Sequence, residues 1–134
     1  MAVFNRFDQL SEDLAHKVHD LSADEIIVLL TNVAPVVATG AVAADITEID
    51  YTNLSSRVVT RTSSGQTAGV YTLVLADLVL TATGAVGPFR YAVLANNTPV
   101  AKPLLGYYDR GESVTLQAND TLTLDFSAEA ISLT

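Results

Sequence analysis

Residues 84–97, GAVGPFRYAVLANN, place the strongest constraint on the fold of this chain. Gly87-Pro88 predicts a sharp entry, because glycine allows unusual backbone angles and proline fixes φ. Asn96-Asn97 begins a turn at the other end. In a strand, alternate side chains point to opposite faces, and here the two sets would be Phe89, Tyr91 and Val93, and Arg90, Ala92 and Leu94. Since nearly all of them are apolar, we expect a central strand that is covered on both faces.

Arg90 is the exception in this apolar run. A guanidinium group among apolar side chains needs a charged partner or a route to water. The simpler interpretation is a salt bridge within the chain or an extended arginine that reaches solvent. The alternative is a contact with another subunit, which makes Arg90 a candidate interface residue.

From Arg57 onward, short β-type runs alternate with turn residues. Strands are expected at 57–64, 70–75, 78–83, 88–95, 103–109, 113–117 and 121–127, and the tail ISLT could add an edge strand. The runs at 70–75 and 78–83 form either a hairpin or a bent strand pair, and residues 65–69 and 109–112 form turns. The inward positions near the end are Val114, Leu116, Leu122, Leu124 and Phe126. This spacing predicts a mainly β fold, a jelly-roll-like antiparallel β-sandwich with one N-terminal amphipathic helix.

The N-terminal part is different in character. Helical spacing over residues 4–21 places one apolar stripe on Phe7, Leu10, Leu14, Val18 and Leu21. This stripe either seals the chain's own core or docks on another chain. Glu25–Asn32 is a short apolar run that favours a strand, and residues 33–56 read as a long loop with a helical turn near 43–49. We expect a single domain over 1–134, with an arm and helix at 1–22 and a sandwich at 23–134.

Charge and composition exclude several classes of protein. The formal charge is −8, which disfavours direct binding to nucleic acid. No apolar run reaches the ~18 residues of a membrane-spanning helix, so no membrane association is expected. The absence of cysteine excludes disulfides and thiolate chemistry. Residues 1–50 carry a net charge of −7, from nine acidic residues against Arg6 and Lys17. This negative charge either keeps the segment solvated or complements a basic surface on a partner.

Residues that could carry chemistry are few. His16 and His19 have a spacing that can bind a metal from one helix, but the sequence offers no further His or Cys to complete a site. Ser63-Ser64-Gly65 lacks the glycine that precedes the serine of a nucleophile elbow. The acidic residues near the predicted turns, Asp109, Glu112, Asp120 and Asp125, are of the kind that bond the local backbone. We therefore predict no catalytic, cofactor-binding or metal-binding residues and no enzyme activity.

Tyr107-Tyr108 are adjacent residues in an expected strand, so one of them should reach the outer face. An exposed tyrosine suits a protein interface or a sugar-binding platform, or it caps the rim of the sandwich. The candidate interface residues are Phe4, Phe7, Leu10, Leu14, Arg90, Tyr107 and Tyr108.

Two segments together, FNRFDQLSEDLAHKVHDLSADEIIVLLTNVAP at 4–35 and GPFRYAVLANNTP at 87–99, resemble a family of virion proteins of tailed bacteriophages. The family is that of the head decoration, or cement, proteins of the jelly-roll kind, as in short-tailed Bordetella-type phages. The likeness also runs through residues 36–50 and 63–84. These motifs are structural, so the resemblance points to a role and not to a reaction.

The resemblance implies a protein on the outer surface of the capsid that binds and cements neighbouring major capsid protein subunits. It implies self-association, with a dimer favoured and a trimer as the alternative, and no cofactor. Two other functions stay open, namely another virion component such as a tail or fibre base, and a carbohydrate-binding jelly roll used in host adsorption.

Overall fold

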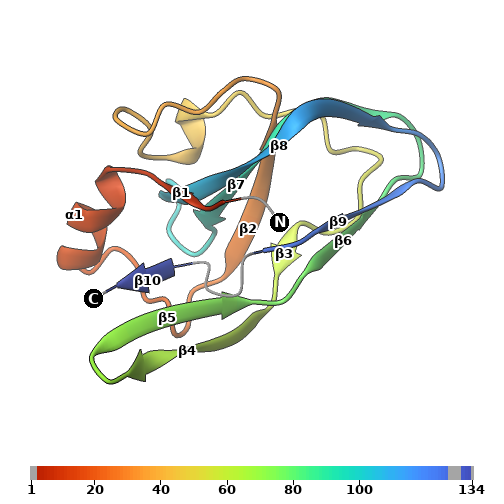
Figure 1. The fold of residues 1–134 in the computed structure, drawn as a ribbon. Helices are drawn as coiled ribbons and strands as arrows, with labels where there is room; N and C mark the ends of the chain where they lie inside the picture. The colour runs from red at the N-terminus through yellow and green to blue at the C-terminus, as the bar shows by residue number, and fades with distance from the viewer. Residues whose placement is uncertain (1–2, 127–130, 134) are drawn as a thin grey trace.

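The computed structural model describes residues 3–126 and 131–133, which form a mainly β, sandwich-like fold with one α-helix (Figure 1). The elements are β1 (Asn5–Arg6), α1 (Gln9–Ala15), β2 (Ile26–Thr31), the 3-10 helix η1 (Ala43–Asp45), β3 (Val58–Val59), β4 (Arg61–Thr67), β5 (Val70–Leu75), β6 (Leu78–Thr81), β7 (Val86–Asn96), β8 (Leu104–Leu116), β9 (Thr121–Leu124) and β10 (Ile131–Leu133). All named strand pairs are antiparallel, as the sequence predicts.

The upper layer is a five-stranded sheet with the order β1-β8-β7-β2-β3. β7 is its central strand and contains the apolar segment that the sequence marks as central. It pairs with β2 from Ile26↔Asn96 to Thr31↔Tyr91 and with β8 on its other edge. Every residue of β2 is buried, which explains why that strand reads as a continuous apolar run and not as an alternating one.

Both faces of this sheet are covered. Ala92 and Leu94 of β7 face the inner core between the layers, whereas Val93 and Ala95 belong to a second cluster on the outer face. The predicted alternation fails at Phe89, which packs in the inner core although Tyr91 does not. The register of β7 against β8 shifts between Phe89 and Tyr91, and an extra residue at such a point reverses the side-chain faces.

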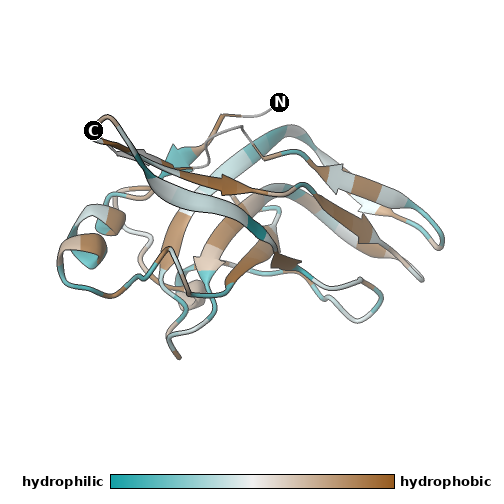
Figure 2. Cartoon of the chain, turned by 90° about the horizontal axis from the view of Figure 1, so that it is seen from below, coloured by the Kyte–Doolittle hydropathy of each residue, from teal (hydrophilic) through white to brown (hydrophobic). Residues whose placement is uncertain are grey.

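The lower layer consists of a three-stranded sheet, β10-β5-β4, and a two-stranded sheet, β6-β9 (Figure 1). β5 and β6 follow one another with only Ala76-Asp77 between them, yet they pair with different strands. They therefore form the bent strand pair, not the hairpin, of the two predicted alternatives. Seen from below, apolar residues lie along much of both layers (Figure 2).

Several further local predictions are wrong. The strand expected at 57–64 is divided at Thr60 between β3 and β4, which belong to different sheets, and of the turn expected at 65–69 only 68–69 remain outside the strands. The turn expected at 109–112 lies inside β8, where Gly111 takes a φ of +97° and the strand continues. The helix expected over 4–21 is restricted to Gln9–Ala15, because Asn5–Arg6 pair with β8 instead. A chain that enters as an edge strand gains main-chain hydrogen bonds that a longer helix would forgo.

The apolar stripe nevertheless faces inward. Phe7 and Leu10 are both 0% exposed, Leu21 is buried, and Leu14 packs against the inner core. The backbone N–H of Phe7 donates to the Leu105 carbonyl at 3.2 Å, which holds the start of the chain against β8. The helix therefore seals the core of its own chain.

We predict that Leu10→Ala lowers the free energy of unfolding by about 2–4 kcal/mol, because it removes a fully buried side chain and leaves a cavity. Urea denaturation followed by circular dichroism measures this change. The control Ser11→Ala alters an exposed neighbour on the same helix and should change stability by less than about 0.5 kcal/mol. Equal effects of the two substitutions would contradict the placement of the helix.

Candidate interaction surface

Residues 32–50, called here the outer segment, cross the outer face of the five-stranded sheet and cover its second apolar cluster. Val37, Ala43 and Ile46 supply the covering side chains. Main-chain hydrogen bonds attach the segment at several points, from Asp8 N–H to the Val37 carbonyl at 3.0 Å and from Leu104 N–H to the Ala41 carbonyl at 2.9 Å. The long loop expected from the sequence is therefore packed on the sheet and held there by main-chain hydrogen bonds.

The acidic residue Asp45 organises the middle of the outer segment. Its carboxylate accepts the main-chain N–H groups of Val42 at 3.0 Å and Ala41 at 2.9 Å. These two hydrogen bonds lower the pKa of the Asp45 carboxyl, so it keeps its charge in mildly acidic solution. The negative charges expected from the acidic N-terminal part thus include one that is held in a defined position on this face.

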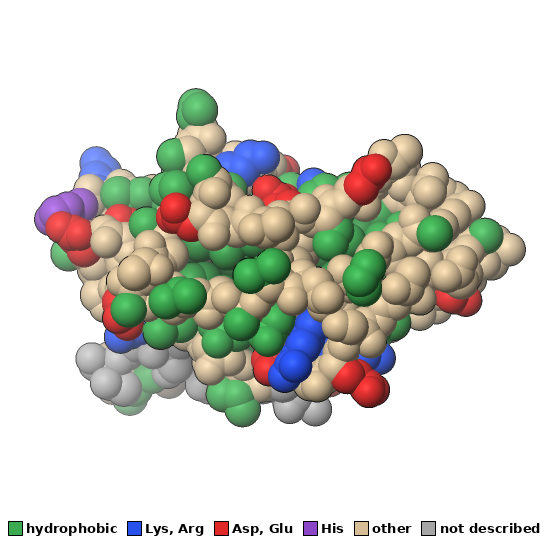
Figure 3. Space-filling model, turned by 90° about the horizontal axis from the view of Figure 1, so that it is seen from above, with side chains coloured by type: hydrophobic (Ala, Val, Ile, Leu, Met, Phe, Trp, Pro, Cys, Tyr) green, Lys and Arg blue, Asp and Glu red, His purple; other side chains and the backbone are tan. Residues whose placement is uncertain are grey.

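The outer segment presents large apolar side chains to solvent. Val33 and Val36 are each 58% exposed, and Val100, in the turn between β7 and β8, is fully exposed. Val33 and Val36 line a hollow of about 290 Å³, together with Pro35 and Ile46. Seen from above, several groups of apolar side chains reach the surface among polar and acidic ones (Figure 3). Apolar contacts within a polar surround are the usual composition of a protein interface.

The far edge of β2 is fixed by two side chains that sequence reasoning did not single out. The Tyr51 hydroxyl accepts the Leu30 N–H at 2.9 Å and donates to Glu48 at 2.8 Å, and burial raises the pKa of that hydroxyl. The Arg57 guanidinium lies 3.5 Å from the centre of the Tyr51 ring and donates to the Val28 carbonyl at 2.8 Å. Together they satisfy main-chain groups of β2 beyond its short pairing with β3.

The N-terminal candidate residues are core residues. Phe7 and Leu10 have no exposed surface, so they are not contacts for another chain in this conformation. Leu14 is half-buried against the inner core. Phe4 is also half-buried, with its ring centre 5.5 Å from that of Tyr108.

Arg90 has a partner within the chain. Its guanidinium donates to both oxygens of Asp109, at 2.8 and 3.0 Å, and lies 5.3 Å from the Tyr91 ring centre. The Arg90 hydrogen bonds, with one from Gly111 N–H, lower the pKa of the Asp109 carboxyl. Since both side chains keep more than a third of their surface exposed, this is the salt bridge of the simpler interpretation, and an inter-subunit role for Arg90 stays a prediction.

Tyr107 and Tyr108 face opposite sides of the sheet, as alternation predicts. Tyr108 is buried in the inner core beside Phe126, which leaves it little surface for another molecule. Tyr107 is half-buried on the outer face, with its ring centre 5.9 Å from Phe7 and 6.0 Å from Tyr91. Of the pair, only Tyr107 belongs to the outer surface.

His16 and His19, which the sequence marks as a weak metal pair, are separated by their surroundings. The His16 side chain is two-thirds exposed, whereas that of His19 is fully buried. Among the residues that the structure describes, no group of three or more His, Cys, Asp or Glu is placed to hold a metal ion.

A buried polar network surrounds His19 instead. The Asn96 amide oxygen accepts the Thr98 N–H at 3.1 Å, and its nitrogen donates to Asp24 at 2.6 Å and faces His19 Nδ1 at 3.0 Å. Because the amide nitrogen is a donor, Nδ1 acts as the acceptor and the proton is on Nε2. Nε2 has no hydrogen-bond partner, and the nearest acidic oxygen, on Asp13, is 3.8 Å away.

Three comparisons with known proteins found no relative of this chain. No family model matches the chain. Neither the search of curated proteins nor that of solved structures found a match. In the described part of the chain, no helix is long and apolar enough to cross a membrane.

We predict that acid weakens the fold through His19. Burial lowers the pKa of His19 below its ordinary value of 6.5, and this effect outweighs the opposite pull of Asp13 and Asp24. The unfolded chain then binds a proton more readily than the folded one, so stability falls as pH drops below 6.5. The slope contributed by this group cannot exceed about 1.4 kcal/mol per pH unit. Urea denaturation between about pH 7.5 and pH 5 measures it.

Two variants isolate this contribution. His19→Gln should lower overall stability but flatten its pH dependence just below pH 6.5. His16→Gln removes the exposed histidine and should leave the slope unchanged. The assignment fails if the two variants show the same slope as the unsubstituted chain.

Proposed function

We propose that this chain is a structural virion protein that binds the outer surface of a bacteriophage capsid and cements neighbouring major capsid protein subunits. The observation that carries the proposal is the outer segment, a fixed layer with exposed Val33 and Val36 and a positioned acidic group, Asp45. The resemblance of residues 4–35 and 87–99 to decoration proteins supports the same role. The sandwich-like fold is compatible with it.

In this role the chain works by binding and has no catalytic activity. Contacts made only with the assembled, expanded lattice shift the capsid toward that state by mass action. Many copies on one shell multiply a modest contact, particularly if the protein binds as a dimer. The chain carries a net charge of −8, so a basic capsid surface is the complementary partner.

The proposal predicts that the purified protein co-sediments with expanded capsids assembled in its absence. Val36→Asp places a charge in the apolar contact and should weaken binding about tenfold or more. Val79→Asp is a matched control, since Val79 is similarly exposed, at 54%, but lies on β6 of the lower layer. It should leave binding unchanged.

The proposal fails if the protein does not bind expanded capsids and heads assemble and keep their stability without it. If Val79→Asp lost binding while Val36→Asp kept it, the contact would lie on the lower layer and the assignment of the outer segment would be overturned. Circular dichroism and gel filtration establish that both variants are folded before binding is compared.

A further inference from the structure

The two long sides of the sandwich are not equivalent. On one side, β3 leads into β4 across the two layers with a single residue between them. Beyond β3, the main chain of β2 is satisfied by Tyr51, Arg57 and the outer segment, with Ile49 N–H donating to the Leu30 carbonyl at 3.0 Å. The edge of β2 on that side is therefore covered, whereas β4 is an edge strand of the lower layer.

The other side lies between β8 of the upper layer and β9 of the lower layer, and is called here the open side. Among the described residues, β9 pairs only with β6, and β8 has a strand partner on its outer edge only where β1 meets Gly106 and Tyr107. β9 has the sequence TLTL and pairs without a register shift, so it carries no lysine, proline or bulge of the kind that protects a free edge.

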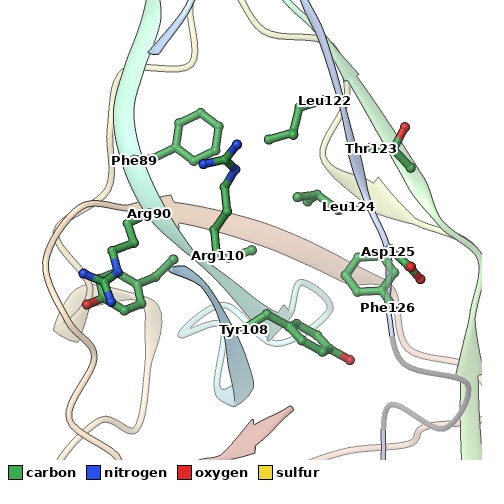
Figure 4. A pocket seen from close by; sticks show the side chains of 11 residues that line it. Phe89, Arg90, Tyr108, Arg110, Leu122, Thr123, Leu124, Asp125 and Phe126 are labelled. Atoms are coloured by element: carbon green, nitrogen blue, oxygen red, sulfur yellow. The ribbon is translucent and has the colours of Figure 1, made fainter. Parts of the chain in front are cut away.

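A cavity of about 220 Å³ lies behind this free edge. Leu122 and Leu124 of β9 and the following Phe126 supply its apolar lining on this side (Figure 4). Phe89 and Tyr108 supply the facing wall from β7 and β8. A dry apolar cavity of about 150 Å³ is already large enough to take benzene, so this one can take an apolar side chain.

Arg110 supplies a charge at the cavity. Its side chain rises from β8 toward Phe89 and Leu122, and it keeps 37% of its surface exposed (Figure 4). Its nearest carboxylate oxygen, on the exposed Glu112, is 3.9 Å away, which is a weak contact in water. The neighbouring Arg90, by contrast, is paired at hydrogen-bond distance with Asp109. Arg110 also donates to the Glu112 main-chain carbonyl at 3.2 Å, but its nearest carboxylate lies beyond hydrogen-bond distance, so of the two it is the guanidinium that can receive an anionic group.

We propose that the open side binds an extended segment of another polypeptide, which adds a strand to the free edge of β9. The segment would place an apolar side chain in the cavity and an acidic side chain against Arg110. A polypeptide fits better than a small amphiphile, because the unpaired N–H and C=O groups of β9 need main-chain partners at the strand spacing. This proposal does not depend on the capsid role.

The test uses a capped peptide of alternating threonine and valine with one glutamate. Added to the full-length protein, it should shift the amide resonances of residues 121–124 and slow their hydrogen exchange, because those groups gain partners. Arg110→Gln should weaken binding about three- to fivefold. Arg6→Gln, a change at an exposed arginine that does not line the cavity, should leave it unchanged.

Main-chain pairing is tested separately. A version of the peptide that is N-methylated on its pairing edge should bind at least about tenfold more weakly, since each methyl group removes a hydrogen-bond donor. The proposal is overturned if the peptide does not bind at millimolar concentration or if N-methylation has no effect. It is also overturned if decanoate binds the cavity as tightly as the peptide, which would make the cavity a site for a small apolar anion.

Discussion

The pairing of β7 with both β2 and β8 is the interaction on which the rest of the structure depends. It buries the main chain of β7 on two edges, and the apolar residues Ala92 to Ala95 fill cores on two faces. Each such leucine or valine contributes about 1.5–3 kcal/mol when it leaves water. A strand used in this way requires a layer above and a layer below it. The outer segment and the lower layer of the sandwich meet that requirement.

Paired polar side chains support this arrangement. Asn96 ends β7 and joins His19 and Asp24 from the N-terminal part, and the Arg90 pair with Asp109 spans β7 and β8. Tyr51 and Arg57 close the edge of β2. A buried or half-buried polar group costs free energy unless it is paired, so most of these residues have fixed partners within the chain.

Two surfaces in the described part of the chain follow from these demands. The outer segment covers the second core with its inward side chains, and this leaves Val33 and Val36 toward solvent. On the open side, β9 pairs only with β6 among the described strands. Both follow from the same geometry, since a sheet covered on both faces still has edges, and a covering loop still has an outer side.

Local sequence patterns were enough to specify the β-rich antiparallel architecture, the central position of residues 88–95 and the inward positions of Leu116 and Phe126. These depend on local periodicity and on apolar runs, which a single segment carries. The apolar stripe that contains Phe7 and Leu10 could also be predicted, and the structure shows that both side chains are buried.

Only the tertiary structure decided the features that depend on distant partners. Pairing with β8 turned Asn5–Arg6 into a strand, the shifted register placed Phe89 in the inner core, and β8 ran through the expected turn at 109–112. His19, which the sequence offers only as half of an incomplete metal pair, lies inside the protein beside Asn96, 77 positions away. Main-chain pairing and burial join residues that are far apart in sequence, so no local pattern records them.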